Sequence, residues 1–198
     1  MLIGVIFITL LAGCGALAGI VIGRAMYQSP IITIDLHETA DCQYPCWMHI
    51  IPGKTSFIVA NDLILQAGYN GGERPFNGEV KYTPPTLTRC EVRLFVLNDT
   101  VNRLRLINCQ PTHLGDVIEI LGQPEGVISD RFAMAFRGGK VLIYVQRILC
   151  EKRFAPDTLV GTIDFLNDTQ PTYSIYPWQG FFVDLRRYMW RNSVSVEC

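Results

Sequence analysis

Charged side chains are absent from the start of the chain, between Met1 and Gly23. No lysine or arginine precedes this apolar run, and that lack argues against a cleaved secretory signal, which begins with a basic segment. A helix over the run would be about 34 Å long at about 1.5 Å per residue, enough to cross a hydrocarbon layer of about 30 Å. We therefore expect residues 1–26 to form a transmembrane anchor.

A lipoprotein signal is the alternative for the same segment. Leu11-Ala12-Gly13-Cys14 resembles the bacterial lipobox, in which Cys14 would become the lipidated first residue. The residues that follow stay membrane-compatible up to Gly23, whereas a lipoprotein usually continues into a polar tether. Three glycines at four-residue spacing would share one helix face and let the helix pack closely against another membrane helix. These glycines are Gly15, Gly19 and Gly23.

Signatures of common enzymes are also lacking. The chain has no Gly-x-Ser-x-Gly elbow of the kind that presents a nucleophilic serine. Gly53-Lys54-Thr55 ends like a phosphate-binding loop, but Met48 stands where such a loop needs its upstream glycine. We interpret this segment as a turn and helix cap, and we expect neither enzymatic activity nor a cofactor.

Histidine is scarce, and His37, His49 and His113 are not at the spacing of metal ligands. Cys42, Cys46 and His49 could ligate zinc, but no fourth ligand is evident and an oxidising compartment would favour disulfides. The formal net charge is −1, so no global field would recruit nucleic acid. We predict neither a bound metal nor a nucleic-acid partner.

Cysteine, by contrast, is well represented. Of the seven cysteines, all but Cys14 follow the apolar run: Cys42, Cys46, Cys90, Cys109, Cys150 and Cys198. An even number without C-x-x-C spacing fits a disulfide-stabilised domain in an oxidising compartment, with the connectivity left open. Arg24, the basic residue next to the apolar run, would instead favour a cytoplasmic domain. We give the cysteines more weight and predict a single-pass membrane protein with its main domain on the extracytoplasmic side.

One disulfide can be tested against strand geometry. Cys90 and Cys109 flank a predicted hairpin symmetrically, so they would face each other at its open end. The apolar pattern prefers a register that differs by one residue, with Leu94 opposite Leu104 and Val92 opposite Leu106. A one-residue bulge would reconcile the two arrangements. The remaining side chains of the hairpin would then lie on the outer face: Arg93, Phe95, Arg103 and Arg105.

Helix and strand signals recur in the same order along the rest of the chain. An apolar stretch that Thr55 or Ser56 can cap and that Gly68 ends predicts a short helix. A glycine-rich loop and strands at 90–97 and 101–107 follow it. A second compact helix over 114–124, with glycine and proline at its end, precedes a hairpin at 132–145 with a Gly-Gly turn. We predict an α+β fold with a single N-terminal transmembrane helix and an extracytoplasmic domain of two helix-plus-antiparallel-hairpin units. The predicted parts are an anchor at 1–26, a stalk at 27–41, a first unit at 42–110, and a second unit with a C-terminal extension at 111–198.

Three motifs resemble known proteins: Cys42-Gln-Tyr-Pro-Cys46-Trp47, Ile51-Pro52-Gly53-Lys54-Thr55, and Leu114-Gly115-Asp116 followed by Leu121-Gly122-Gln123-Pro124. They are similar to motifs of uncharacterised, cysteine-containing bacterial envelope proteins. The unit of Gly-Asp, helix, Leu-Gly-x-Pro and hairpin also resembles the small SmpA/OmlA-type lipoproteins of outer-membrane barrel assembly and inhibitor domains of like fold. The resemblance covers about Cys42 to Val145 and implies that the chain binds proteins. A long glycine-rich loop and the extension after Cys150 depart from that pattern.

The C-terminal segment combines aromatic and basic side chains more densely than any other part of the chain. Such residues are enriched in binding hot spots and at membrane–water boundaries. They would either close a core or form a surface for a partner or for lipid headgroups. The candidate surface comprises Trp178, Arg186, Arg187, Tyr188, Trp190 and Arg191.

These observations favour a membrane-anchored accessory or scaffold subunit whose extracytoplasmic domain binds other proteins, in a multi-subunit membrane complex. Its expected partners are the membrane and other membrane or envelope proteins. One alternative is a solute- or envelope-polymer-binding module that uses the loop from Tyr69 to Asn77 as a lid. Another is a hydrolase or thiol enzyme whose residues are too scattered to recognise. The sequence does not identify a small-molecule ligand.

Overall fold

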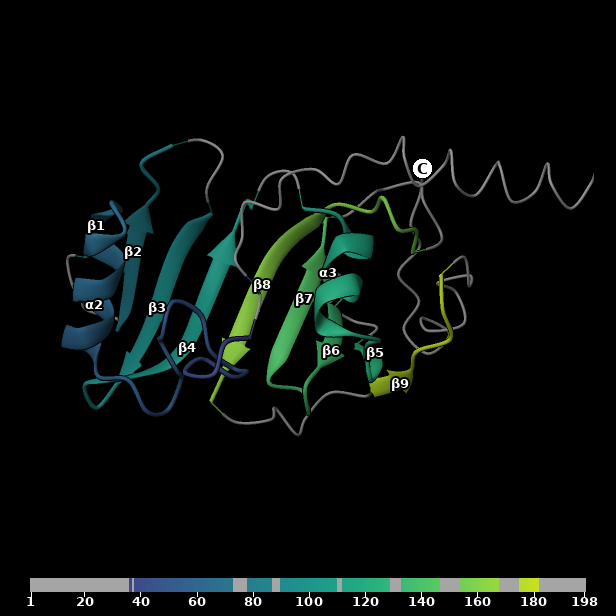
Figure 1. The fold of residues 1–198 in the computed structure, drawn as a ribbon, viewed down its shortest axis with the longest axis horizontal. Coiled ribbons are helices and arrows are strands. Elements are labelled where there is room, and N and C mark those ends of the chain that lie inside the picture. Colours follow the sequence, from purple (N-terminus) through teal and green to yellow (C-terminus); the bar gives the residue numbers. More distant parts are fainter. Residues whose placement is uncertain are drawn as a thin grey trace, which may run out of the picture. The chain divides into compact units, whose positions relative to one another are not determined.

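The computed structural model describes residue 36 and residues 38–72, 78–86, 90–109, 112–128, 133–146, 154–167 and 175–181. Over these residues, nine strands form one antiparallel sheet in the order β1-β2-β3-β4-β8-β7-β6-β5-β9 (Figure 1). Two helices accompany the sheet in the same part of the chain.

The first half of the sheet follows the first described helix. Its elements are α2 (Phe57–Gln66), β1 (Asn70–Gly71), β2 (Glu79–Thr83), β3 (Glu91–Leu97) and β4 (Thr100–Ile107). The second half follows the other helix. Its elements are α3 (Leu114–Leu121), β5 (Gly126–Ile128), β6 (Ala133–Phe136), β7 (Val141–Val145), β8 (Val160–Leu166) and β9 (Ile175–Pro177).

The two halves join in the middle of the sheet. In each half, a helix is followed by four strands that pair in sequence order, and β4 then pairs antiparallel with β8. Leu104 lies opposite Phe165, and Leu106 lies opposite Ile163, so both halves contribute to one buried layer. β9 adds a further strand beside β5.

The predicted fold class is therefore wrong, because the protein does not consist of two helix-plus-hairpin units. The segment interpreted as a glycine-rich loop contains β1 and β2, and the segment interpreted as an extension contains β8 and β9. β1 has two residues and β5 has three, so an alternating apolar pattern cannot be recognised in either. Pairing with neighbouring strands, rather than local sequence, defines these elements.

No helix in the described ranges is long and apolar enough to cross a membrane. The predictions of a transmembrane helix and of a single-pass, extracytoplasmically oriented protein are corrected by this finding. An uncharged run shows only that a segment is compatible with hydrocarbon, and it does not by itself establish a spanning helix. The run at residues 1–26 lies outside the described residues, together with Cys14 and the glycines Gly15, Gly19 and Gly23.

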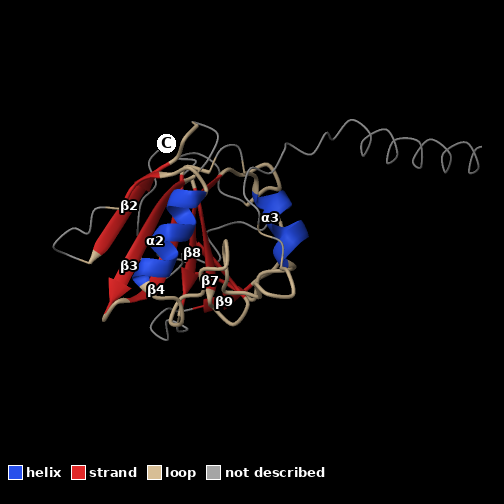
Figure 2. Ribbon diagram, turned by 60° about the vertical axis from the view of Figure 1, so that its left-hand side comes forward, coloured by secondary structure: helices blue, strands red, loops and turns tan. Residues whose placement is uncertain are grey.

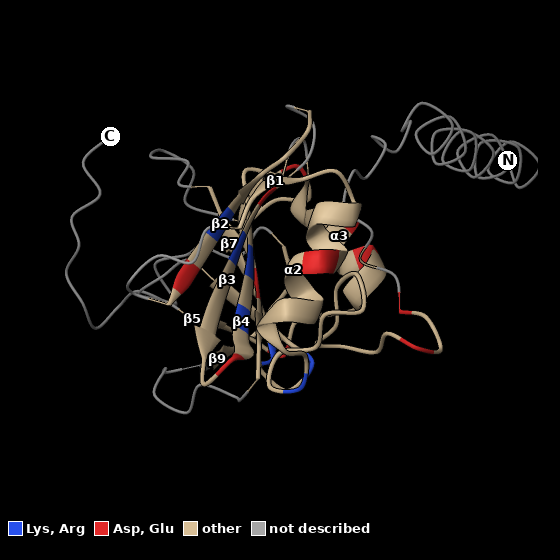
Figure 3. Ribbon diagram, turned by 90° about the vertical axis from the view of Figure 1, so that its left-hand side faces the viewer, with Lys and Arg blue, Asp and Glu red and all other residues tan. Residues whose placement is uncertain are grey.

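Both helices lie on the same side of the sheet, as Figures 2 and 3 show from two directions. The loop that carries Cys42 and Cys46 lies on this side as well, between the helices (Figure 1). Ala60 and Ile64 of α2 and Leu114 and Val117 of α3 pack with the sheet in one hydrophobic core. The other side of the sheet is free of described helices.

The β3–β4 hairpin confirms the predicted register and the predicted disulfide. Val92 lies opposite Leu106, and Leu94 lies opposite Leu104. Cys90 and Cys109 are disulfide-bonded, with their Cα atoms 4.2 Å apart. The strand register would place Asn108 opposite Cys90, but Asn108 has a left-handed backbone with φ of 54° and turns out of the ladder. This extra residue lets Cys109 reach Cys90.

Candidate functional site

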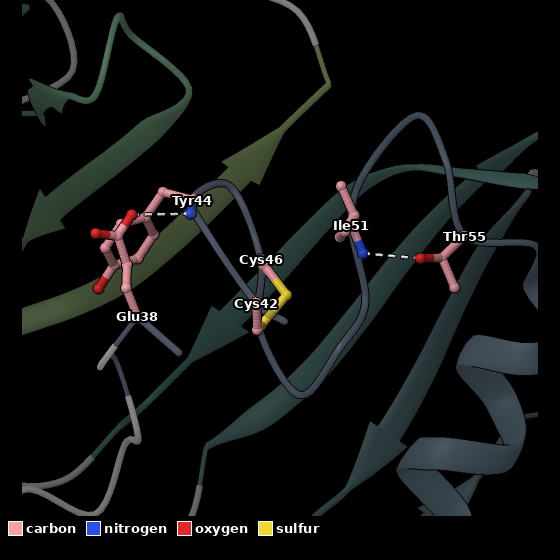
Figure 4. Close-up of a disulfide and its surroundings, with 6 residues drawn as sticks. All are labelled: Glu38, Cys42, Tyr44, Cys46, Ile51 and Thr55. Carbon is pink, nitrogen blue, oxygen red and sulfur yellow. Dashed lines mark hydrogen bonds between the residues drawn. A yellow bond between two sulfur atoms is a disulfide. The ribbon is translucent and has the colours of Figure 1, made fainter. Parts of the chain in front are cut away.

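The Cys42–Cys46 disulfide closes a short loop over the sheet, with its Cα atoms 5.3 Å apart (Figure 4). Within that loop, the backbone N–H of Tyr44 donates a hydrogen bond to Glu38 Oε1 at 3.1 Å. The Arg137 guanidinium lies 5.3 Å from the centre of the Tyr44 ring and 3.5 Å from Glu38 Oε2. These contacts connect the loop to the β6–β7 turn and indicate a structural role.

The described cysteines offer no free thiol, because Cys42, Cys46, Cys90 and Cys109 are all disulfide-bonded. Cys150 and Cys198 lie outside the described residues. Zinc ligation by Cys42 and Cys46 would require this disulfide to be reduced. Among the described residues, no group of three or more histidine, cysteine or acidic side chains could hold a metal ion.

A histidine–carboxylate pair occurs at the start of α3. His113 Nδ1 lies 3.5 Å from Asp116 Oδ2, which also accepts a hydrogen bond from the His113 backbone N–H at 3.4 Å. Gly115 packs against the backbone of Pro156, where an added Cβ atom would lie 3.0 Å from the Pro156 oxygen. The Gly115 backbone N–H also donates to that oxygen at 2.8 Å. The His113–Asp116 pair therefore has a structural role: it caps the start of α3, which the Gly115 contacts attach to the 154–158 segment.

The candidate surfaces predicted from the sequence are only partly described. Trp178 packs against Phe154 and Phe181, with ring centroids 5.9 and 5.6 Å away, and contacts the hydrophobic core. Tyr69, at the start of the proposed lid, is buried in the same core. The rest of the predicted surface lies outside the described residues: Arg186, Arg187, Tyr188, Trp190 and Arg191.

Charged side chains gather on the side of the sheet opposite the two described helices. Lys81, Arg93, Arg105 and Asp164 lie in one row across β2, β3, β4 and β8. Figure 3 shows basic positions on β2, β3 and β4. Like charges directly opposite one another on neighbouring strands are destabilising unless acidic groups compensate them. We call this surface the charged face; its members are Glu79, Lys81, Glu91, Arg93, Arg103, Arg105 and Asp164.

Two glutamates compensate the outer part of the charged face. Arg93 donates hydrogen bonds to Glu91 Oε1 at 2.7 Å and to Glu79 Oε1 at 3.0 Å, and Lys81 Nζ lies 2.9 Å from Glu91 Oε2. Partial burial alone would raise the pKa of Glu91, but the hydrogen bonds from Lys81 and Arg93 outweigh it and lower that pKa below 4.5. The hydrogen bond to Glu91 in turn raises the pKa of Arg93.

The inner part of the charged face centres on Asp164, whose side chain is fully buried. Arg105 binds this carboxylate with two hydrogen bonds, from Nε to Oδ1 at 2.7 Å and from Nη2 to Oδ2 at 3.1 Å. Arg103 Nη2 donates to the same Oδ2 atom. The sequence pattern predicts both arginines on the outer face. It does not predict Asp164 as their partner, because β8 was not recognised as a strand.

An apolar surface lies on the other side of the molecule, on α2. Five large apolar side chains are exposed in the described ranges, and three of them belong to this helix. Their exposed fractions are 72% for Ile58, 51% for Val59 and 41% for Leu65. We call these three residues the α2 patch. The only charged residue of α2 is Asp62, which is exposed among them.

Comparisons with protein families, with curated proteins and with solved structures find no match to this chain. The resemblance to SmpA/OmlA-type lipoproteins and envelope proteins therefore stays a prediction. The α2 patch and the charged face are the candidate functional surfaces that the described residues provide.

Proposed function

We propose that this chain is an accessory or scaffold protein that binds another protein through the α2 patch. The observation that carries the proposal is the high exposure of Ile58, Val59 and Leu65 on a single ten-residue helix. A surface helix of a globular protein normally turns polar side chains toward water. Apolar side chains gathered on an exposed surface are typical of protein-binding sites.

The spacing of the exposed residues favours a helical or grooved partner surface. Ile58, Asp62 and Leu65 follow one another at intervals of four and three residues, so they share one face of α2. Such anchors are the contacts through which an amphipathic helix binds a hydrophobic groove or another helix. Asp62 at the centre favours a partner whose apolar surface carries one basic side chain opposite it.

The same charge argues against a second copy of the chain as the occupant. In a symmetric pair of α2 helices crossing at their centres, the two Asp62 carboxylates would face each other. Like charges brought together in an interface are unfavourable and select against such a partner. We therefore propose a different protein as the partner.

The α2 patch is presented on a firmly held helix. On the inner side of α2, Ala60 and Ile64 are fully buried in the core. Asn61 Oδ1 accepts a hydrogen bond from the Tyr82 hydroxyl at 2.8 Å, and the Phe57 backbone N–H donates to Asp99 O at 2.7 Å. A surface that is already ordered loses less conformational freedom when a partner binds.

A designed helical peptide with an apolar stripe and a central lysine tests the proposal. Chemical-shift changes on titration of the labelled chain should map to α2. Ile58→Ser should weaken binding by about tenfold, because the variant no longer buries a large apolar side chain in the complex. Ile58 is largely exposed, so the variant should keep the stability of the folded state.

Leu159→Ser is the matched control, since Leu159 is also an exposed apolar residue but lies outside α2. It should bind the peptide as the original chain does. Shift changes that map away from α2, or equal losses of affinity in the two variants, would contradict the proposal.

A further inference from the structure

The inner part of the charged face contains more positive charge than its carboxylate can neutralise. Arg103 and Arg105 share Asp164, and one carboxylate compensates at most one of the two guanidinium groups. The neighbouring Arg93 differs, because it has Glu79 and Glu91 as partners. The surplus charge is thus localised at Arg103 and Arg105.

Hydrogen-bond donors are also left over at this position. Arg105 uses Nε and Nη2 for Asp164, and Arg103 uses Nη2. Neither Nη1 group donates a hydrogen bond within the described ranges. Arg103 Nε also lacks a partner there, but this atom is buried and is not open to a ligand. Both side chains retain exposed surface, 20% for Arg103 and 27% for Arg105, so a ligand can reach them.

Phe95 and Asp164 hold the two arginines in place from different directions. The guanidinium carbon atoms of Arg103 and Arg105 lie 5.3 and 5.6 Å from the centre of the Phe95 ring. Cation–π contact with a ring and hydrogen bonding to a buried carboxylate restrict both side chains. Donors that are fixed in advance bind an anion at a smaller entropic cost.

We propose that Arg103 and Arg105 form a binding site for a carboxylate group on the sheet face opposite the helices. A guanidinium presents paired N–H groups that match a planar carboxylate. The single negative charge of a carboxylate matches the one uncompensated positive charge at the site, whereas a phosphate monoester carries more negative charge. The site is separate from the α2 patch, because the two lie on opposite sides of the sheet.

Arginine side-chain NMR tests the site directly. The Nε–Hε resonances of the full chain are followed during titration with sodium acetate, and separately with sodium phosphate, at ionic strength matched with sodium chloride. We expect saturable acetate-dependent shifts at Arg103 and Arg105 and weaker binding of phosphate. Arg103→Gln should weaken acetate binding by about tenfold, as expected for loss of hydrogen bonds to a charged group.

Two further variants keep the test decisive if Arg103→Gln is poorly folded. Arg105→Gln removes the other arginine, leaves Asp164 paired with Arg103, and should also weaken acetate binding by about tenfold. Arg137→Gln is the control, because Arg137 lies in the β6–β7 turn, where it pairs with Glu38, and it should leave acetate binding unchanged. Shifts that do not saturate, that chloride reproduces, or that appear equally at Arg93 would overturn the proposal.

Discussion

At the scale of single residues, Tyr82 is the side chain that most clearly connects the sheet to α2. It is fully buried, and its hydroxyl donates to Asn61 Oδ1 at 2.8 Å. Gly72 leaves room for the ring, since a Cβ atom there would lie 3.0 Å from Tyr82 Cε1. The helix that presents the α2 patch is thus positioned by a buried tyrosine from β2.

Burial raises the pKa of Tyr82 from 10.0 to about 12. Because the folded-state pKa exceeds the unfolded value, the protonated tyrosine contributes stability that is fully present below pH 10.0 and is lost as pH rises toward about 12. Tyr82→Phe should abolish this part of the pH dependence, and at neutral pH it should cost about 1 kcal/mol for the lost hydrogen bond. Urea unfolding at several alkaline pH values measures both effects. An unchanged alkaline slope in Tyr82→Phe would assign the titration to another group.

At the scale of elements, the β3–β4 hairpin was predictable and its neighbours were not. The alternating apolar residues and the symmetric cysteines together predict its register. They also predict one extra residue before the second cysteine, and Asn108 is that residue. β2 and β8 also alternate in part, but their pairing partners lie far away along the chain. Short-range patterns identify a hairpin because both strands and the turn are read together.

The two disulfides in the described part of the chain should differ in their contribution to stability. Cys90–Cys109 spans 19 residues and Cys42–Cys46 spans four, and a longer closed loop restricts the unfolded chain more. Replacing Cys90 and Cys109 by alanine should lower the free energy of unfolding by about 3 kcal/mol, and replacing Cys42 and Cys46 by about 2 kcal/mol. Urea denaturation of the two double variants gives the comparison. A larger loss of unfolding free energy in the Cys42/Cys46 variant would contradict this account, because it would mean that native contacts, rather than loop length, determine how much each disulfide stabilises the protein.

At the scale of the whole molecule, the pairing of β4 with β8 creates the single sheet. This contact joins residues that are distant in sequence, such as Leu106 and Ile163, and no local pattern specifies it. It also creates the inner charged face, because Asp164 meets Arg103 and Arg105 only across this seam. The candidate carboxylate site could not have been derived from the sequence for that reason.

The α2 patch was likewise missed, although its residues belong to a correctly anticipated helix. The helix is apolar on nearly all sides, so the sequence could not tell which apolar residues face the core. The structure separates them: Ala60 and Ile64 are buried, whereas Ile58 and Leu65 are exposed. Exposure, not composition, therefore supports the proposed protein-binding function.

A charge-reversal titration tests the central claim, that a partner docks on α2 with a basic group facing Asp62. Calorimetric titration compares the original chain and Asp62→Lys, each with two designed apolar-striped helical peptides that carry a central lysine or a central glutamate. The original chain should bind the lysine peptide about fivefold more tightly than the glutamate peptide, because an exposed ion pair contributes roughly 1 kcal/mol. Asp62→Lys should bind the glutamate peptide more tightly. The same preference in both proteins would contradict docking on α2.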